Sequence, residues 1–264
     1  MPNRQLQGLI TSPTRKHQHP AIVSCETGSH GELGPHMRVG TRVMGVDACK
    51  KGWVGISSDR RGYFGVTIAA VVAAAEVDGA LAVVGVDIPI GLPLTGARQA
   101  DVLARRMVGR RASSVFSTPV REALLAATHA EASAVNLRAT GKGLSQQAYA
   151  LARKILEVDA WAPTAGCAVI EVHPEVCFAT MAGRPLVHPK STWAGGEERR
   201  QLLASVGMQV PADIGRAGEF AGVDDVLDAA AAAWTAGRYA EGRAIAYPEP
   251  PEVFGDGWPA AIWA

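Results

Sequence analysis

Five carboxylates stand where they could bind a divalent cation. Asp47 and Asp87 each end an apolar run, Glu171 lies inside another, and Asp225 and Asp228 open an alanine-rich segment far along the chain. A carboxylate is costly to bury alone, so acidic side chains in apolar surroundings are often gathered around a metal ion. Mg²⁺ and Mn²⁺ are the expected ions, because both prefer hard oxygen ligands. The predicted metal ligands, which are also the predicted catalytic residues, are Asp47, Asp87, Glu171, Asp225 and Asp228.

Ordinary structural roles compete with this interpretation. Asp225, like its neighbour Asp224, could cap the helix that it opens and interact with the helix dipole. Asp87 precedes Ile-Pro and could only fix a turn. Glu171 has the weakest alternative, since a lone buried carboxylate is expensive.

A cationic stretch suggests what such a metal site would act on. Between Arg98 and Arg121 there are six arginines and one aspartate, Asp101. Arginine pairs bidentately with phosphate, and a local basic patch is the usual electrostatic footprint of a nucleic-acid-binding surface. A solvent-exposed helix face would also explain some of these arginines, because Asp101 and Arg105 are four residues apart and could form an ion pair along a helix. His173 could be a base, a ligand or a substrate contact, or it could simply fix the end of a strand. The predicted substrate-binding residues are Arg105, Arg106, Arg110, Arg111, Ser114, His173 and Lys190.

The composition bounds the class of protein. The chain has 264 residues, 48% of them hydrophobic, and a formal net charge of +1, so nucleic-acid binding would have to come from local patches. The four cysteines are scattered without a CxxC pair, which is typical of reduced thiols in a cytoplasmic protein and argues against zinc. No apolar run approaches the roughly 18 residues of a membrane span, and no signal peptide is evident. A cytoplasmic protein without a membrane partner is expected.

The elements that must position the carboxylates begin after an atypical N-terminal segment. Residues 1–41 are rich in Pro, Gly, His, Ser and Thr and carry no periodicity, which predicts a disordered arm. The runs Val43–Ala48, Trp53–Ser57 and Tyr63–Ile68 are separated by short turns and predict an antiparallel meander. Residues 42–264 are expected to form one domain.

Later segments alternate between strands and helices. Continuous apolar runs at Ala80–Asp87 and Ala168–Val172 predict buried, parallel strands. Residues 97–161 are good helix formers and predict a helical insertion, with Val120–Ala139 as one helix. The expected class is therefore an α/β fold, a mixed sheet of three antiparallel strands and then parallel strands, flanked by helices in the order of the ribonuclease H-like fold. If the strands ending at Asp47 and Asp87 are neighbours, their carboxylates meet at one edge of the sheet.

Several motifs in one order carry a resemblance. They are Gly45-Val-Asp47 with Lys51-Gly-Trp53, Asp87-Ile-Pro-Ile-Gly91-Leu-Pro93, Ser114-Val-Phe-Ser-Thr-Pro119, Glu171-Val-His-Pro-Glu175 and Asp224-Asp-Val-Leu-Asp228-Ala. Over about Val43–Trp263 the chain resembles the "domain of unknown function 429" family of predicted RNase H-like nucleases. The resemblance implies the ribonuclease H-like fold and metal-dependent nuclease chemistry. By analogy with RuvC-type resolvases it implies Asp47 as the central-strand ligand and Asp225 or Asp228 as helix ligands. Asp87 or Glu171 would supply the remaining carboxylate.

The leading functional hypothesis is a metal-dependent nuclease that hydrolyses phosphodiesters of DNA or RNA. One alternative is an ATP-dependent phosphotransferase of the actin-like class, because the turn that follows Asp47 resembles the phosphate-binding hairpin of those proteins. Against it, no second glycine-rich phosphate loop is evident. Another alternative is a non-catalytic nucleic-acid-binding protein that keeps its acidic residues for structural reasons.

Overall fold

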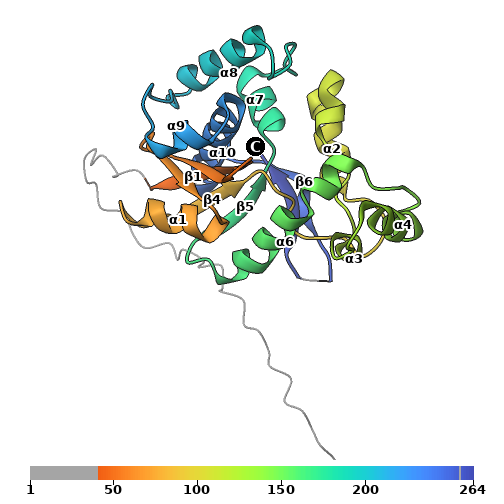
Figure 1. Ribbon diagram of the computed structural model, residues 1–264. Coiled ribbons are helices and arrows are strands. Elements are labelled where there is room, and N and C mark those ends of the chain that lie inside the picture. Colours follow the sequence, from red (N-terminus) through yellow and green to blue (C-terminus); the bar gives the residue numbers. More distant parts are fainter. Residues whose placement is uncertain (1–40, 256) are drawn as a thin grey trace, which may run out of the picture. The chain divides into compact units, whose positions relative to one another are not determined.

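The described residues fold around a mixed sheet, and helices cover both of its faces (Figure 1). The computed structural model describes residues 41–255 and 257–264. The seven strands follow the order β3-β2-β1-β4-β5-β7-β6. Their bounds are β1 (Val43–Cys49), β2 (Gly52–Ser57), β3 (Gly62–Gly65), β4 (Val83–Val86), β5 (Ala168–Val172), β6 (Ala246–Val253) and β7 (Pro259–Trp263).

Strand directions confirm the expected α/β fold. Strands β1, β2 and β3 form an antiparallel meander, and β4 and β5 then add in parallel to β1. Strand β7 continues the parallel set, and β6 closes it as an antiparallel edge. The third strand ends at Gly65, earlier than the predicted Ile68. There the side chain of Thr67 accepts a hydrogen bond from the backbone N–H of Ala70 and caps a helix that begins at Ile68.

The helices are distributed between the two faces. Their bounds are α1 (Ile68–Glu76), α2 (Gln99–Val108), α3 (Arg121–Leu124), α4 (His129–Thr140), α5 (Gln146–Ala150), α6 (Ala152–Trp161), α7 (Pro174–Ala182), α8 (Trp193–Ser205), α9 (Arg216–Phe220) and α10 (Val223–Ala240), with short 3₁₀ helices η1 (Gly109–Ser114) and η2 (Ala162–Thr164). One core packs α1 and α6 against the sheet, and the other packs α7, α8 and α10 against the opposite face.

The segment 97–161 is helical, as expected, and connects β4 to β5. Its predicted helix Val120–Ala139 was wrong, however, because the structure has two helices there, α3 and α4. Thr128 and Glu131 form a reciprocal capping box that starts a new helix at His129. This Thr-x-x-Glu pattern is a local start signal that helix propensity alone does not register.

Helix α10 is the element that decides where the acidic residues meet. Its alanine-rich middle is fully buried and lies against β1 and β4. A Cβ on Gly45 of β1 would lie 2.0 Å from the backbone nitrogen of Ala233, and a Cβ on Gly85 of β4 would lie 2.9 Å from the carbonyl oxygen of Ala232. Two strand glycines and small helix residues therefore let this helix approach the sheet closely.

One sequence-based expectation lies outside the described residues, and another concerns membrane-spanning helices among those that are described. The predicted disordered arm, residues 1–41, lies outside the described residues except for its last position. Within the ranges that the structure describes, no helix combines the length and the apolar character needed to cross a membrane.

Candidate metal centre

The triplet Gly-Val-Asp occurs twice, at residues 45–47 and 85–87, and the sheet places the two copies side by side. Gly45 pairs with Gly85 and Val46 with Val86 in parallel register, and the N–H of Asp87 donates to the carbonyl oxygen of Val46. Because side chains alternate along a strand, the glycine and the aspartate of each triplet point to the same face. Because each glycine lacks a side chain, α10 can pack closely against it, and the aspartate two residues later lies next to this contact.

Asp228 completes the cluster from the helix. One carboxylate oxygen from each of Asp47, Asp87 and Asp228 lies within 4.8 Å of the other two. Asp47 is 7% exposed, Asp228 is 3% exposed and Asp87 is half-buried. Three oxygen donors from β1, from the end of β4 and from α10 form a set that can hold a metal ion. We call Asp47, Asp87 and Asp228 the aspartate cluster.

The electrostatics of the aspartate cluster favour a cation. Burial, followed by the nearby Asp87 and Asp228 carboxylates, raises the pKa of Asp47 well above its usual value of 3.8. Burial raises the pKa of Asp87 to about 7 and that of Asp228 to about 6, although Lys190 lowers both. Three carboxylates that resist ionisation together would ionise more readily around a divalent ion.

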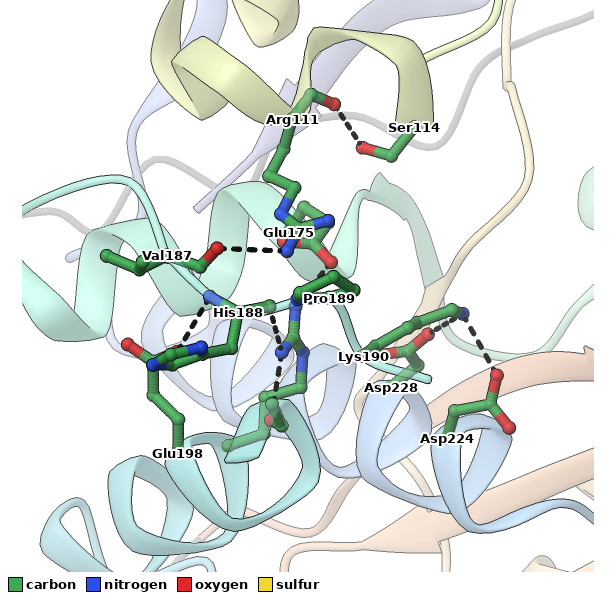
Figure 2. Close-up of polar contacts among 12 residues, drawn as sticks. Arg111, Ser114, Glu175, Val187, His188, Pro189, Lys190, Glu198, Asp224 and Asp228 are labelled. Carbon is green, nitrogen blue, oxygen red and sulfur yellow. Dashed lines mark hydrogen bonds and ion pairs between the residues drawn. The ribbon is translucent and has the colours of Figure 1, made fainter. Parts of the chain in front are cut away.

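Lys190 is the cation that accompanies the aspartate cluster in this structure. It lies between α7 and α8, and its Nζ is 2.6 Å from Oδ2 of Asp228 and 3.5 Å from Oδ2 of Asp224 (Figure 2). Burial alone would lower the pKa of Lys190, but the carboxylates of Asp228, Asp47 and Asp87 raise it. Lys190 is therefore an ammonium ion at the edge of the cluster, with 40% of its side chain exposed.

Glu171 is not brought into the aspartate cluster. Its Oε2 accepts hydrogen bonds from Nη2 of Arg98 at 2.6 Å and from the N–H of Ile90 at 2.7 Å. Arg98 is fully buried, and burial raises the pKa of Glu171 to about 7 while Arg98 lowers it. Glu171, which the sequence alone left as a buried carboxylate without a partner, is therefore paired with an arginine 73 residues away along the chain.

Asp225 also forms a hydrogen bond at the start of α10 and lies outside the aspartate cluster. Its Oδ2 accepts the backbone N–H of Gly222 at 2.9 Å, which fastens the chain at the start of α10. Asp225 is half-buried, whereas Asp228, one turn further on, reaches the cluster. Of the two helix positions that the sequence left open, the structure thus brings Asp228 to Asp47 and Asp87.

The predicted phosphate-binding residues divide into bonded and exposed ones. Arg105 donates to the carbonyl oxygen of Val115 and to Oγ of Ser117, so it ties α2 to the following loop. Arg106 and Arg110 are exposed. Arg111 donates to the carbonyl oxygen of Val187, three residues before Lys190, and its own carbonyl accepts the hydroxyl of Ser114 (Figure 2). The arginine-rich segment therefore adjoins the loop that carries Lys190.

His173 directly precedes α7. Burial lowers the pKa of His173, and its Nδ1 is a buried atom without a hydrogen-bond partner among the described residues. Glu175 forms a buried ion pair with Arg199 of α8. Arg199 also donates to the carbonyl oxygen of Gly195, so this guanidinium joins α7 to α8. The Arg199 side chain is fully buried.

The repeated Gly-Val-Asp triplet is a signal in the sequence for this pairing of strands. Two identical triplets at the ends of two apolar runs would have predicted paired positions on neighbouring parallel strands. The sequence did not identify Arg98 as the partner of Glu171 or Glu175 as the partner of Arg199, because such pairs join distant segments.

The raised pKa values predict how pH affects the metal-free protein. Between 3.8 and about 7, the folded protein keeps a proton on Asp87 that the unfolded chain releases, so this group's contribution to stability falls as pH rises through that window. Asp87→Asn should therefore raise the melting temperature at pH 8 relative to wild type and have little effect at pH 4. At pH 8, Mg²⁺ at a hundredfold excess over its Kd should stabilise the wild type by about 2.7 kcal/mol. The same addition should stabilise the variant much less.

Calorimetric melting curves with EDTA or MgCl₂, at pH 4 and pH 8, measure both effects. Equal stabilisation of wild type and Asp87→Asn by Mg²⁺ would contradict a metal site at the aspartate cluster.

Comparisons with known proteins agree with the sequence resemblance. A family model described as "Protein of unknown function (DUF429)" matches residues 45–253, which include all three residues of the aspartate cluster. Neither the curated proteins nor the solved structures gave a match. Because the family model covers most of the chain, this protein belongs to the DUF429 family.

Proposed function

We propose that this protein is a nuclease that uses Mg²⁺ or Mn²⁺ to hydrolyse phosphodiester bonds of nucleic acid. The observation that carries the proposal is the convergence of Asp47, Asp87 and Asp228 at the carboxyl ends of two neighbouring parallel strands. Such an edge, open to ligands outside the strand ends, is where sheets of this class commonly bind substrates.

The donor set suits the proposed ion. All three ligands are carboxylates, without the thiolate or imidazole ligands that favour softer metals. A bound Mg²⁺ or Mn²⁺ would act as a Lewis acid toward a phosphate oxygen and would lower the pKa of a bound water. The protein contributes the rigid placement of the carboxylates, since β1, β4 and α10 are fixed in the core.

The surroundings of the cluster support a phosphate-bearing substrate. Lys190 supplies an ammonium group beside Asp228, and Arg111 places a second cationic segment against the same loop. An ammonium and a guanidinium both suit phosphate oxygens. If a divalent ion bound the aspartate cluster, Lys190 would no longer be needed by Asp228 and could contact a substrate phosphate.

Lys190→Met tests that role. The variant should raise KM for a cleavable oligonucleotide by about ten- to a hundredfold, because a hydrogen bond to a charged group contributes about 1.5–3 kcal/mol. Its affinity for Mg²⁺ should rise, since the competing ammonium is gone. Steady-state kinetics and isothermal titration with MgCl₂ give the two values. Unchanged values for both would remove Lys190 from the site.

A panel of substrates tests the proposed function directly. Labelled single-stranded DNA, duplex DNA, RNA and an RNA–DNA hybrid are incubated with the full chain in Mg²⁺, Mn²⁺ or EDTA, beside Asp47→Asn purified in the same way. Cleavage that needs the ion and Asp47 is the expected result. An absence of cleavage throughout, or equal cleavage by Asp47→Asn, would overturn the proposal. ATP hydrolysis or an ATP-dependent rise in melting temperature without cleavage would instead favour the phosphotransferase alternative.

A further inference from the structure

A groove of about 410 Å³ adjoins the aspartate cluster between the first turns of α8 and α10. Its walls include Trp193 and Arg200 from α8 and Val223 from α10, and Lys190 and Asp224 also line it. Lys190 lines the groove and also donates to Asp228, so this side chain connects the groove to the proposed metal ligands. Neither the family description nor the proposed hydrolysis assigns the groove a role.

Trp193 is the most exposed large hydrophobic side chain among the described residues, at 88%. The backbone that carries it is nevertheless held in place. Thr192 caps the helix by accepting the N–H of Gly195, and a Cβ on Gly195 would lie 1.9 Å from the carbonyl oxygen of Pro189. The close approach of Pro189 to α8 therefore fixes the backbone at Trp193, whose side chain lines the groove.

The groove combines apolar surface with cationic groups. Val223, 63% exposed, adds an aliphatic surface to that of the indole ring. Arg200 is exposed, and within residues 41–255 and 257–264 no hydrogen bond or ion pair occupies its guanidinium. The acids that line the groove already have partners, Asp224 with Lys190 and Glu197 with Gln201.

We propose that this groove binds an unpaired nucleobase of the strand whose neighbouring phosphate lies at the aspartate cluster. An exposed indole offers a stacking face that every base can use, and Arg200 can neutralise a flanking phosphate. The volume lies within the range of small-ligand sites. A base inside a duplex already has both faces stacked, so the groove selects single-stranded nucleic acid or an unpaired end. This inference rests on the proposed function for the phosphate at the cluster.

Binding in EDTA separates this inference from cleavage. The probe is a fluorescently labelled single-stranded oligonucleotide, compared with the same strand in a duplex and with an abasic strand of equal length. Trp193→Ala should weaken binding of the base-bearing strand about tenfold, as expected for the loss of one base–aromatic stack. Trp193→Phe should keep most of the affinity. The abasic strand should bind wild type and Trp193→Ala equally.

Gly196→Leu gives a second variant that tests the groove itself. Gly196 lines the groove, and a Cβ there would meet nothing within 4 Å, so leucine fits α8 and extends into the space of the base. Leucine also favours a helix over glycine, so the melting temperature should not fall. Binding of the base-bearing strand should weaken as it does in Trp193→Ala.

The outcomes distinguish the two proposals. If Trp193→Ala and Gly196→Leu bind the base-bearing strand as tightly as wild type, or if wild type binds the abasic strand as tightly, the base groove is refuted, whatever the cleavage assay shows. If the base-dependent binding is seen but no strand is cleaved in Mg²⁺ or Mn²⁺, the groove stands and the proposed nuclease activity fails.

Discussion

Asp47→Asn is expected to lower metal-dependent cleavage at least about a hundredfold while leaving the fold intact. Asp47 lies on β1, an interior strand of the sheet, and its pKa is raised by the nearby carboxylates of both Asp87 and Asp228. Asparagine has nearly the same shape and keeps one oxygen, but it lacks the negative charge that a divalent ion requires. The rate constant under saturating substrate and Mg²⁺ measures the loss.

Asp225→Asn is the matched control for this result. It makes the same chemical change in the first turn of α10. Asp225, however, accepts the backbone N–H of Gly222 and is not part of the aspartate cluster. Its cleavage rate should stay within a fewfold of wild type, with a stability cost of about 1 kcal/mol or less for the weakened cap. A large loss of activity in Asp225→Asn, with Asp47→Asn fully active, would reverse the assignment of ligands.

Gly45→Ala is expected to destabilise the protein by about 3 kcal/mol or more, because overpacking against a rigid backbone is costly. The added Cβ would lie 2.0 Å from the nitrogen of Ala233 and 2.1 Å from the carbonyl oxygen of Ala229. Neither atom belongs to a flexible side chain, so α10 would have to move away from β1. Asp228 directly precedes Ala229 and would move with it, so the variant should also lose its stabilisation by Mg²⁺.

Gly237→Ala controls for the effect of glycine replacement as such. A Cβ at this position of α10 would meet only Cγ2 of Val43, at 3.9 Å, an ordinary contact. The substitution should stabilise the protein by about 0.5–1 kcal/mol, since alanine is the better helix former. Urea denaturation followed by circular dichroism compares both variants with wild type. A Gly45→Ala protein as stable as wild type would contradict the close packing of α10 on β1.

Several features of the fold and the site were predictable because their causes are local. The meander, the buried strand that ends at Asp87 and the buried helix that Asp225 opens follow from apolar periodicity and turn residues. Parallel strands that end in aspartate predict that Asp47 and Asp87 converge, and their observed register confirms it. The break between α3 and α4 was missed, although Thr128 and Glu131 signal it locally.

The candidate ligand set could be predicted only in part. Sequence indicated that Glu171 needs a partner, but the choice between a metal ion and Arg98 depends on how the helical insertion folds back over β5. Asp225 and Asp228 share one helix face at the level of sequence. The exact start of α10 decides which of them caps the helix and which faces the sheet.

The sequence by itself determined the kinds of elements, the buried acidic residues and their approximate places at the ends of strands. These depend on patterns within a few residues, where burial and backbone preference act directly. Only the tertiary structure decided which carboxylates meet, because this depends on how closely α10 approaches Gly45 and Gly85 and on which distant cation each acid finds. Electrostatic partners from distant segments meet only in the folded chain and leave no mark on the spacing of residues in the sequence.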